Sequence, residues 1–157
     1  MPSVDASVRV TPAAWGDPDV QRLALAQQAE LRARYDGGSE PGTPPSGADI
    51  GVVLLARDGA GMALGCGALR KLGDGVAELK RMYVVPAARG RGISGTLLGA
   101  LEQEALRRGW TTLRLETGTL QPDAQRFYRR AGYHEIPLFG SYVGSELSVC
   151  FERRLSA

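Results

Sequence analysis

Residues 89–95 have the types and spacing of a loop that binds phosphate groups. They lie between a strand-like run, 79–85, and a helix-like run, 93–108. Glycines let the backbone approach an anion closely, the first amides of a helix have no intrahelical partner, and arginines add positive charge. We therefore expect a pyrophosphate to bind at this loop, which consists of Arg89, Gly90, Arg91, Gly92, Ile93, Ser94 and Gly95.

The loop fits two nucleotide-binding patterns. Its last six residues match G-x-G-x-x-G, which is typical of dinucleotide-binding folds. Glu116 lies 21 residues beyond Gly95, at the end of the next expected strand, where a ribose-binding acid would lie. The first six residues nearly match the coenzyme A pattern (Q/R)-x-x-G-x-(G/A). The loop by itself therefore leaves both ligands open.

The surroundings of the loop favour coenzyme A. In a dinucleotide fold the first glycine follows the strand almost at once, whereas here residues 86–89 intervene. Only about forty residues follow Glu116, which is too few for the further strand-helix units of a doubly wound sheet. Three closely spaced strands also precede the loop, and such tight connections join only antiparallel neighbours.

Hydrophobic periodicity and turn residues predict a mixed α/β (α+β) domain over residues 1–157. Strands are expected at 7–10, 51–57, 63–69, 77–85, 110–116, 133–136 and 146–152, and helices at 18–35, 93–108 and 122–131. The segment 36–49 is rich in Gly, Pro and Ser, so we expect a long loop that serves as a substrate lid. The predicted layout is an antiparallel front half, a strand-helix-strand unit carrying the glycine loop, and a short tail.

Four blocks in this order resemble the GNAT superfamily of acyl-CoA-dependent N-acetyltransferases. They read KRMYVVP at 80–86, RGRGIS with LL at 89–98, LRLET at 113–117 and AQRFYRRAGY at 124–133. The last block is similar to the family signature A-x-x-F-Y-x-x-x-G-(F/Y). The resemblance implies a single GNAT-like domain that transfers an acetyl group from acetyl-CoA to an amine. Ser94 and Gln121 depart from the residues that the family usually has at these places.

The resemblance also implies how the donor binds. The strand through Met82, Tyr83 and Val84 should part from the strand at 113–116, so that its main chain pairs with pantetheine and polarises the thioester carbonyl. Gln121 and Phe127 complete the expected coenzyme A contacts.

The resemblance assigns Tyr128 as the general acid that protonates the departing thiolate. An amine must lose a proton to attack, and Glu78 and Glu116 lie on the two strands expected to flank the thioester. Either carboxylate is a candidate general base, directly or through water. Cys66 has no partner base nearby in the sequence, so direct transfer in a ternary complex is favoured over a covalent intermediate on this thiol.

The acceptor is expected to be a small-molecule or peptide amine, in a pocket lined by Tyr35 and Tyr142. A non-catalytic acyl-CoA sensor and an NAD-dependent oxidoreductase are the alternative functions. Members of the resembled family commonly form homodimers, so a homodimer is one possible assembly for this chain.

Composition excludes several other classes of partner. A net charge of +2 is too small to indicate binding to nucleic acid or to a membrane, and no apolar run is long enough to span a bilayer. We therefore expect a cytoplasmic protein. Cys66, Cys150 and His134 make a poor metal-binding set, so no metal is expected.

Overall fold

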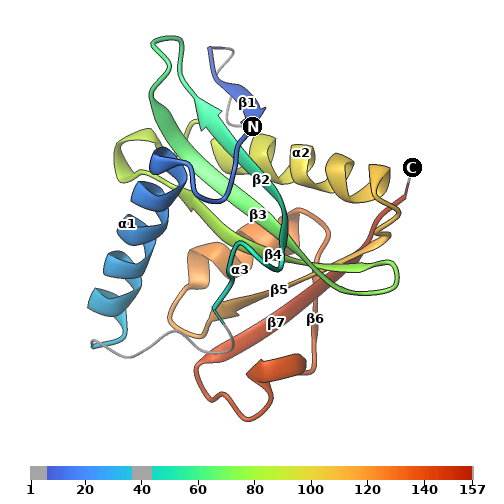
Figure 1. Cartoon of the computed structure of the whole chain (residues 1–157). Coiled ribbons are helices and arrows are strands. Elements are labelled where there is room, and N and C mark those ends of the chain that lie inside the picture. The colour runs from blue at the N-terminus through green and yellow to red at the C-terminus, as the bar shows by residue number, and fades with distance from the viewer. Residues whose placement is uncertain (1–6, 37–43, 157) are drawn as a thin grey trace.

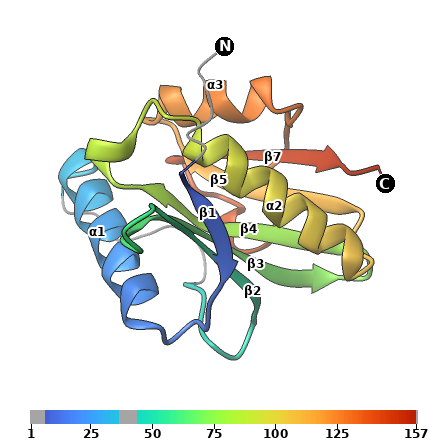
Figure 2. The ribbon, with the colours of Figure 1, turned by 90° about the horizontal axis from the view of Figure 1, so that it is seen from above.

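The computed structural model describes residues 7–36 and 44–156, and it forms one mixed sheet with helices on both faces (Figures 1 and 2). No helix in these ranges has both the length and the apolar content to span a membrane. In chain order the elements are β1 (Arg9–Pro12), α1 (Pro18–Arg34), β2 (Ile50–Arg57), β3 (Ala63–Gly73), β4 (Val76–Val84), the 3-10 turn η1 (Pro86–Ala88), α2 (Ile93–Arg107), β5 (Thr112–Gly118), α3 (Pro122–Arg130), β6 (His134–Ile136), the 3-10 turn η2 (Gly140–Tyr142) and β7 (Ser148–Arg154).

The seven strands lie in the order β1-β2-β3-β4-β5-β7-β6. Every neighbouring pair is antiparallel except β4 and β5, which are parallel and joined through α2. The expected mixed sheet with an antiparallel front half is thereby confirmed. A doubly wound parallel sheet, which a dinucleotide-binding loop would require, is absent from the described residues.

Side chains along β2 and β3 pack into two different cores, one on each face of the sheet. Val53 and Leu55 pack with Val20 and Leu23 of α1 on one face of the sheet. Val52 and Leu54 belong to the larger core on the other face, which includes the buried residues of α2 and α3. Because successive strand residues point to opposite faces, these strands read as almost continuous apolar runs.

The α2 helix follows the apolar spacing of the sequence. Its buried residues are Ile93, Leu97, Leu98, Leu101 and Ala105. Removing a leucine side chain of this kind from water contributes about 1.5–3 kcal/mol. Gly92 caps the helix at its start with φ +76°, a left-handed conformation that glycine adopts without strain.

Three strands, β1, β5 and β7, begin two residues later than the sequence indicated. β1 covers Arg9–Pro12 because its pairing with β2 sets its limits, and Pro12 is tolerated at the end of an edge strand. β7 begins at Ser148 rather than at 146 because the preceding turn continues, with the Ser145 amide donating to the Tyr142 carbonyl. Residues 37–43 of the expected lid lie outside the described residues.

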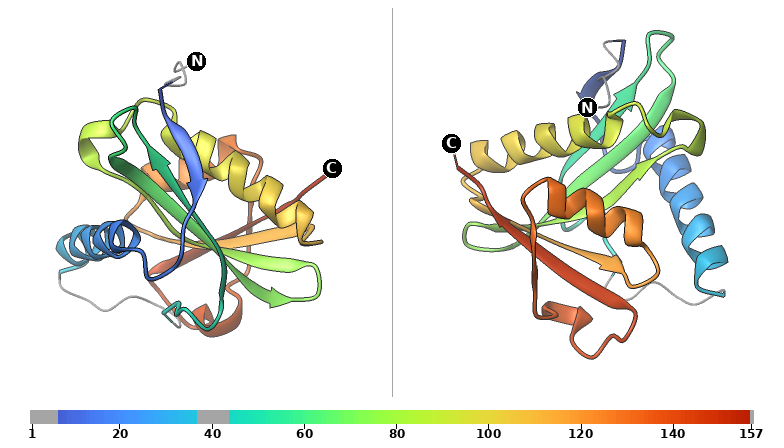
Figure 3. Two further views of the ribbon diagram at one scale, coloured as in Figure 1. Left: turned by 45° about the horizontal axis from the view of Figure 1, so that its top comes forward. Right: turned by 180° about the vertical axis from the view of Figure 1, so that it is seen from behind.

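Pairing between β4 and β5 covers only three residue pairs. It runs from Val76–Thr112 to Glu78–Arg114 and then stops, while β4 continues to Val84 and β5 to Gly118. The two strands run apart beyond this point, which we call the fork (Figure 3). The parting expected from the family resemblance is therefore present, and it leaves one edge of β4 without a neighbouring strand.

Two glycines, one in β3 and one in α2, should respond oppositely to alanine. A Cβ at Gly65 would lie 2.9 Å from the Tyr83 carbonyl oxygen, whereas one at Gly99 of α2 would meet nothing within 4 Å. Gly65→Ala should lower the free energy of unfolding by about 1–3 kcal/mol because the β4 backbone must shift. Gly99→Ala should raise it by about 0.5–1 kcal/mol because a helical glycine is replaced. Urea unfolding measures both changes, and effects of the same sign would contradict this account.

Candidate active site

The phosphate-binding loop forms the start of α2. Gly90 and Gly92 have φ of +80° and +76°, so the loop needs glycine at both places. The first helical hydrogen bond runs from the Thr96 amide to the Gly92 carbonyl. The amides of Ile93, Ser94 and Gly95 therefore have no carbonyl within the helix to bond, and the positive end of the helix dipole lies here. The Ile93 side chain is buried in the core, so only its amide is suited to an anion.

Arg89 is held in place from two sides. Its guanidinium forms two hydrogen bonds with the Glu30 carboxylate, at 2.8 and 3.0 Å, and its Nε donates to the Val84 carbonyl at 2.9 Å. The hydrogen bonds with Arg89 hold the pKa of Glu30 below its usual range, and those with Glu30 raise the pKa of Arg89. This ion pair ties α1 to the loop.

Two hollows meet where β4 and β5 part. The donor groove, about 1120 Å³ of empty space counted with its open mouth, is lined by Tyr83, Val84, Arg89, Ser94 and Phe127 among others. The second hollow, the central cleft, holds about 580 Å³ counted in the same way and reaches Lys80 and Glu116. The residues that line both hollows are Gln27, Leu31, Met82, Gln121, Ala124 and Tyr128. The structure therefore brings the expected coenzyme A residues of β4 and α3, with Gln121 and the loop residues Arg89 and Ser94, to one continuous surface. The other expected loop residues, Gly90, Arg91, Gly92, Ile93 and Gly95, are not in the lining of either hollow.

Tyr128 lies at the junction of the groove and the cleft. Its ring is packed edge-on by Phe127 and Tyr133, with ring centroids 5.1 and 5.8 Å away. Burial raises the pKa of Tyr128 well above its usual value, so the phenol stays protonated at neutral pH. The described residues offer its hydroxyl no hydrogen bond. The arrangement provides a proton donor that a ligand in the cleft can use.

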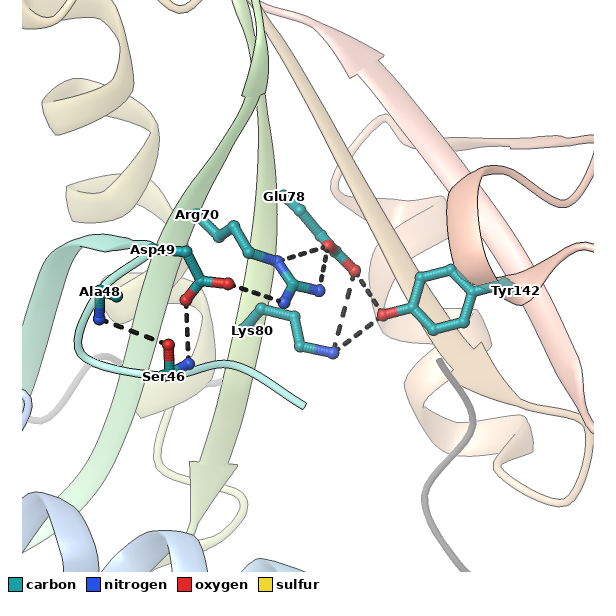
Figure 4. Close-up of polar contacts among 7 residues, drawn as sticks. All are labelled: Ser46, Ala48, Asp49, Arg70, Glu78, Lys80 and Tyr142. Carbon is teal, nitrogen blue, oxygen red and sulfur yellow. Dashed lines mark hydrogen bonds and ion pairs between the residues drawn. The ribbon is translucent and has the colours of Figure 1, made fainter. Parts of the chain in front are cut away.

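Glu78 lies in a buried polar network on β3, β4 and η2 (Figure 4). Its Oε1 accepts hydrogen bonds from Arg70 Nε and Nη2 at 3.1 and 2.8 Å, and its Oε2 accepts one from the Tyr142 hydroxyl at 2.5 Å. Lys80 Nζ donates to the Tyr142 hydroxyl at 2.8 Å and lies 3.8 Å from Glu78 Oε2. Burial and the nearby Glu78 raise the pKa of Tyr142. Both oxygens of the Glu78 carboxylate are thus engaged.

Glu116 lies on the other arm of the fork and lines the central cleft. Its Oε2 accepts a hydrogen bond from Ser148 Oγ at 2.6 Å. It is half-buried, whereas Glu78 is 1% exposed and does not line the cleft. The two carboxylates that looked equivalent in the sequence therefore have different surroundings.

The two tyrosines expected at the acceptor have structural contacts. The Tyr35 hydroxyl, at the end of α1, accepts a hydrogen bond from the Leu120 amide at 3.0 Å. It braces the turn before α3, where Gln121 Oε1 accepts from the Gly118 amide at 2.8 Å. Tyr142 belongs to the buried network around Glu78 rather than to the wall of the cleft.

The Cys66 thiol is unsuited to act as a nucleophile. It is buried, it donates to the Arg81 carbonyl at 3.2 Å, and burial raises its pKa to about 12. The thiolate needed for attack is therefore almost absent at neutral pH. Among the described residues no group of three or more His, Cys, Asp and Glu side chains is arranged to hold a metal ion.

Sequence reasoning missed three residues that contribute to the site. Arg70 and Lys80 interrupt apolar strands, and Arg70 lies directly across from Glu78 in the sheet. A charge inside an apolar strand is a signal that could have found both. Gln27 of α1 lines both hollows, and nothing in its local sequence singles it out.

The fold and the site together define a class of protein. A mixed sheet that forks between two parallel strands, with a phosphate-binding loop on the helix that joins them, is the architecture of acyl-CoA-dependent N-acyltransferases. A model of the acetyltransferase (GNAT) family matches residues 12–133. The chain belongs to this family and is an acyltransferase, which confirms the expectation from its sequence.

Individual relatives agree with this assignment. The chain is 39% identical over 140 residues to the IAA acetyltransferase of Azospirillum brasilense, across 84% of this chain and 91% of the relative. A solved structure from Klebsiella pneumoniae, described as an acyl-CoA N-acyltransferase, is 34% identical with a TM-score of 0.84, across 97% of this chain and all of the other. A GNAT family acetyltransferase from Elizabethkingia anophelis, solved with acetyl-CoA bound, shares the fold at 17% identity and a TM-score of 0.72, across 96% of this chain and 100% of that one.

The two carboxylates at the fork should differ sharply in what they contribute to stability. Glu78→Gln removes the buried negative charge that faces Arg70 and Lys80, while Arg70 keeps its ion pair with the more exposed Asp49. The free energy of unfolding should therefore fall by about 3–5 kcal/mol. Glu116→Gln changes a half-buried carboxylate at the cleft and should cost about 1 kcal/mol or less. Urea unfolding at neutral pH measures both, and equal losses would contradict the distinction.

Proposed function

We propose that this protein transfers an acetyl group from acetyl-CoA to a primary amine by direct attack in a ternary complex. The observation that carries this proposal is the fork, where β4–β5 pairing stops at Glu78–Arg114 and a cleft opens beside Tyr128 and Glu116. The donor groove leads from this cleft to the phosphate-binding loop, as an extended nucleotide thioester requires.

The donor lies with its pyrophosphate on the amides at the start of α2, where the helix dipole favours an anion. Its pantetheine arm follows the free edge of β4 through Met82, Tyr83 and Val84. Arg89, held by Glu30 and the Val84 carbonyl, and Arg91 add positive charge. Gln121 and Phe127 line the opposite wall. The Elizabethkingia relative with acetyl-CoA bound supports this choice of donor.

The amine nitrogen attacks the thioester carbonyl carbon, and the carbon–sulfur bond then breaks. Tyr128 gives its proton to the departing thiolate and recovers one from solvent. The attacking amine loses a proton to Glu116 through water, because only a neutral amine carries the lone pair that attacks. The products are an acetamide and the free thiol of coenzyme A. Glu116 is preferred to Glu78 as the base because both oxygens of Glu78 are engaged in the buried network.

The acceptor is a small-molecule or peptide amine that enters between α1 and the segment containing η2. Tyr35 and Tyr142 act here as supports, since their hydroxyls bond the turn before α3 and the buried network.

Ligand binding and turnover test the proposal together. Acetyl-CoA and CoA should raise the melting temperature, whereas NAD should not. A ligand at 100 times its Kd adds about 2.7 kcal/mol of stability. Release of free thiol from acetyl-CoA across a panel of amines then measures turnover. Stabilisation by NAD alone would overturn the choice of donor, and acetyl-CoA binding without thiol release for any amine would indicate a sensor.

Tyr128→Phe and Glu116→Gln should lower turnover with different pH dependence. Removing either proton-transfer group should cost about 10²-fold in kcat at neutral pH. Burial raises the pKa of Tyr128 and keeps the phenol protonated over the range tested, so the loss in Tyr128→Phe should be constant from pH 6 to 9. The loss in Glu116→Gln should shrink as pH rises, because the amine deprotonates without help.

Steady-state thiol release from pH 6 to 9 separates the two effects. The exposed Glu135→Gln serves as the control and should match the wild type. A loss in Glu116→Gln that is the same at every pH would argue against its role as a base, and full activity in Tyr128→Phe would remove Tyr128 from the mechanism.

A further inference from the structure

Side chains bond two main-chain carbonyls of β4 beyond the fork, those of Met82 and Val84. Gln27 Nε2 donates to the Met82 carbonyl at 2.9 Å, and Arg89 Nε donates to the Val84 carbonyl at 2.9 Å. In a strand the N–H and C=O of one residue point to the same side and alternate along the chain. The amides of Met82 and Val84 therefore face the same free edge as these two carbonyls.

The backbone at Met82 is fixed by a bulge. Cys66 pairs with Tyr83 and Ala68 pairs with Lys80, so β4 carries one more residue than β3 between these pairs. Arg81 has φ +59°, an uncommon conformation for a residue other than glycine. The Cys66 thiol bonds the Arg81 carbonyl from the β3 side, and Gln27 bonds the Met82 carbonyl from α1. The bulge is thus held on both sides by side chains.

Gln27 reaches this position from the middle of α1 and lines both the donor groove and the central cleft. The Met82 carbonyl determines which end of its amide is the donor, because the reversed amide would place two oxygens together. Its Oε1 is buried and has no hydrogen-bond partner in the described residues. A buried unpaired acceptor costs about 1–3 kcal/mol, so this oxygen does not stabilise the fold.

We infer that Gln27 is a positioning residue for acyl transfer, and this inference rests on the proposed function. By bonding the Met82 carbonyl, Gln27 holds the bulged peptide in place and leaves the Met82 amide as the main-chain group that meets the thioester carbonyl. An uncapped carbonyl oxygen here would repel the negative charge that develops on the thioester oxygen. Gln27 therefore acts through Met82 and lowers the barrier to transfer without contributing to coenzyme A affinity.

Three variants test this role. Gln27→Met keeps the volume and removes the donor, so kcat should fall about tenfold, less than for direct loss of an oxyanion donor. The Kd for CoA, which has no acyl carbonyl, should stay within about twofold. Gln27→Lys restores a donor to the Met82 carbonyl but not the Oε1 acceptor, and its kcat should return to within about threefold of wild type. Gln28→Met is the matched control on the same helix and should retain full activity, since Gln28 lines neither hollow.

Thiol release and titration with CoA give the decisive readouts. If the wild type is active and Gln27→Met has the same kcat as the wild type, the inference is overturned. Parallel losses of kcat and CoA affinity in Gln27→Met also overturn it, because they indicate a structural role. A Gln27→Lys variant as slow as Gln27→Met, with CoA affinity intact, overturns the role of the Met82 bond in favour of Oε1. Absence of thiol release in the wild type is the separate failure of the proposed function, and it overturns both.

Discussion

The site depends on one constraint, the end of β4–β5 pairing at Glu78–Arg114. Two parallel strands that stopped pairing inside a sheet would normally leave main-chain groups buried and unbonded, at a cost of about 1–3 kcal/mol each. Here the parting opens a cleft instead, and side chains from α1 and from the loop bond two of the carbonyls on the free edge of β4. The same break in the sheet therefore creates the space for a ligand and leaves the main-chain amides of Met82 and Val84 facing that space.

The buried polar network lies at the apex of the fork. Glu78 is the last residue of β4 that pairs with β5, and its carboxylate is bonded by Arg70 and Tyr142 with Lys80 close by. A network of this kind brings little net stability, because desolvating the charges offsets their attraction. Its bonds have fixed geometry, however, and they join β3, β4 and the η2 segment. The network therefore holds β3, β4 and the η2 segment together at the point where β4 and β5 part.

Much of the fold could be predicted from local patterns. The apolar stripe of α2, the turn at 73–75 between β3 and β4, and the glycines of the loop each depend on neighbours a few residues away. The sequence blocks that resemble the family also predicted the fork, since the expected parting of β4 from β5 is present. The starts of β1, β5 and β7 were wrong by two residues, because pairing and turn geometry rather than propensity decide where strands begin.

The sequence by itself determined the class of protein and the place of the glycine-rich loop at the start of α2, because both depend on residue types at short, fixed spacing. Only the tertiary structure distinguished Glu78 from Glu116, since their surroundings come from strands and turns distant in the chain. It also joined Gln27 to Met82 across 55 residues, a contact that no periodicity encodes. Side-chain partners across a sheet follow from register and helix placement, and these are settled only when the whole core packs.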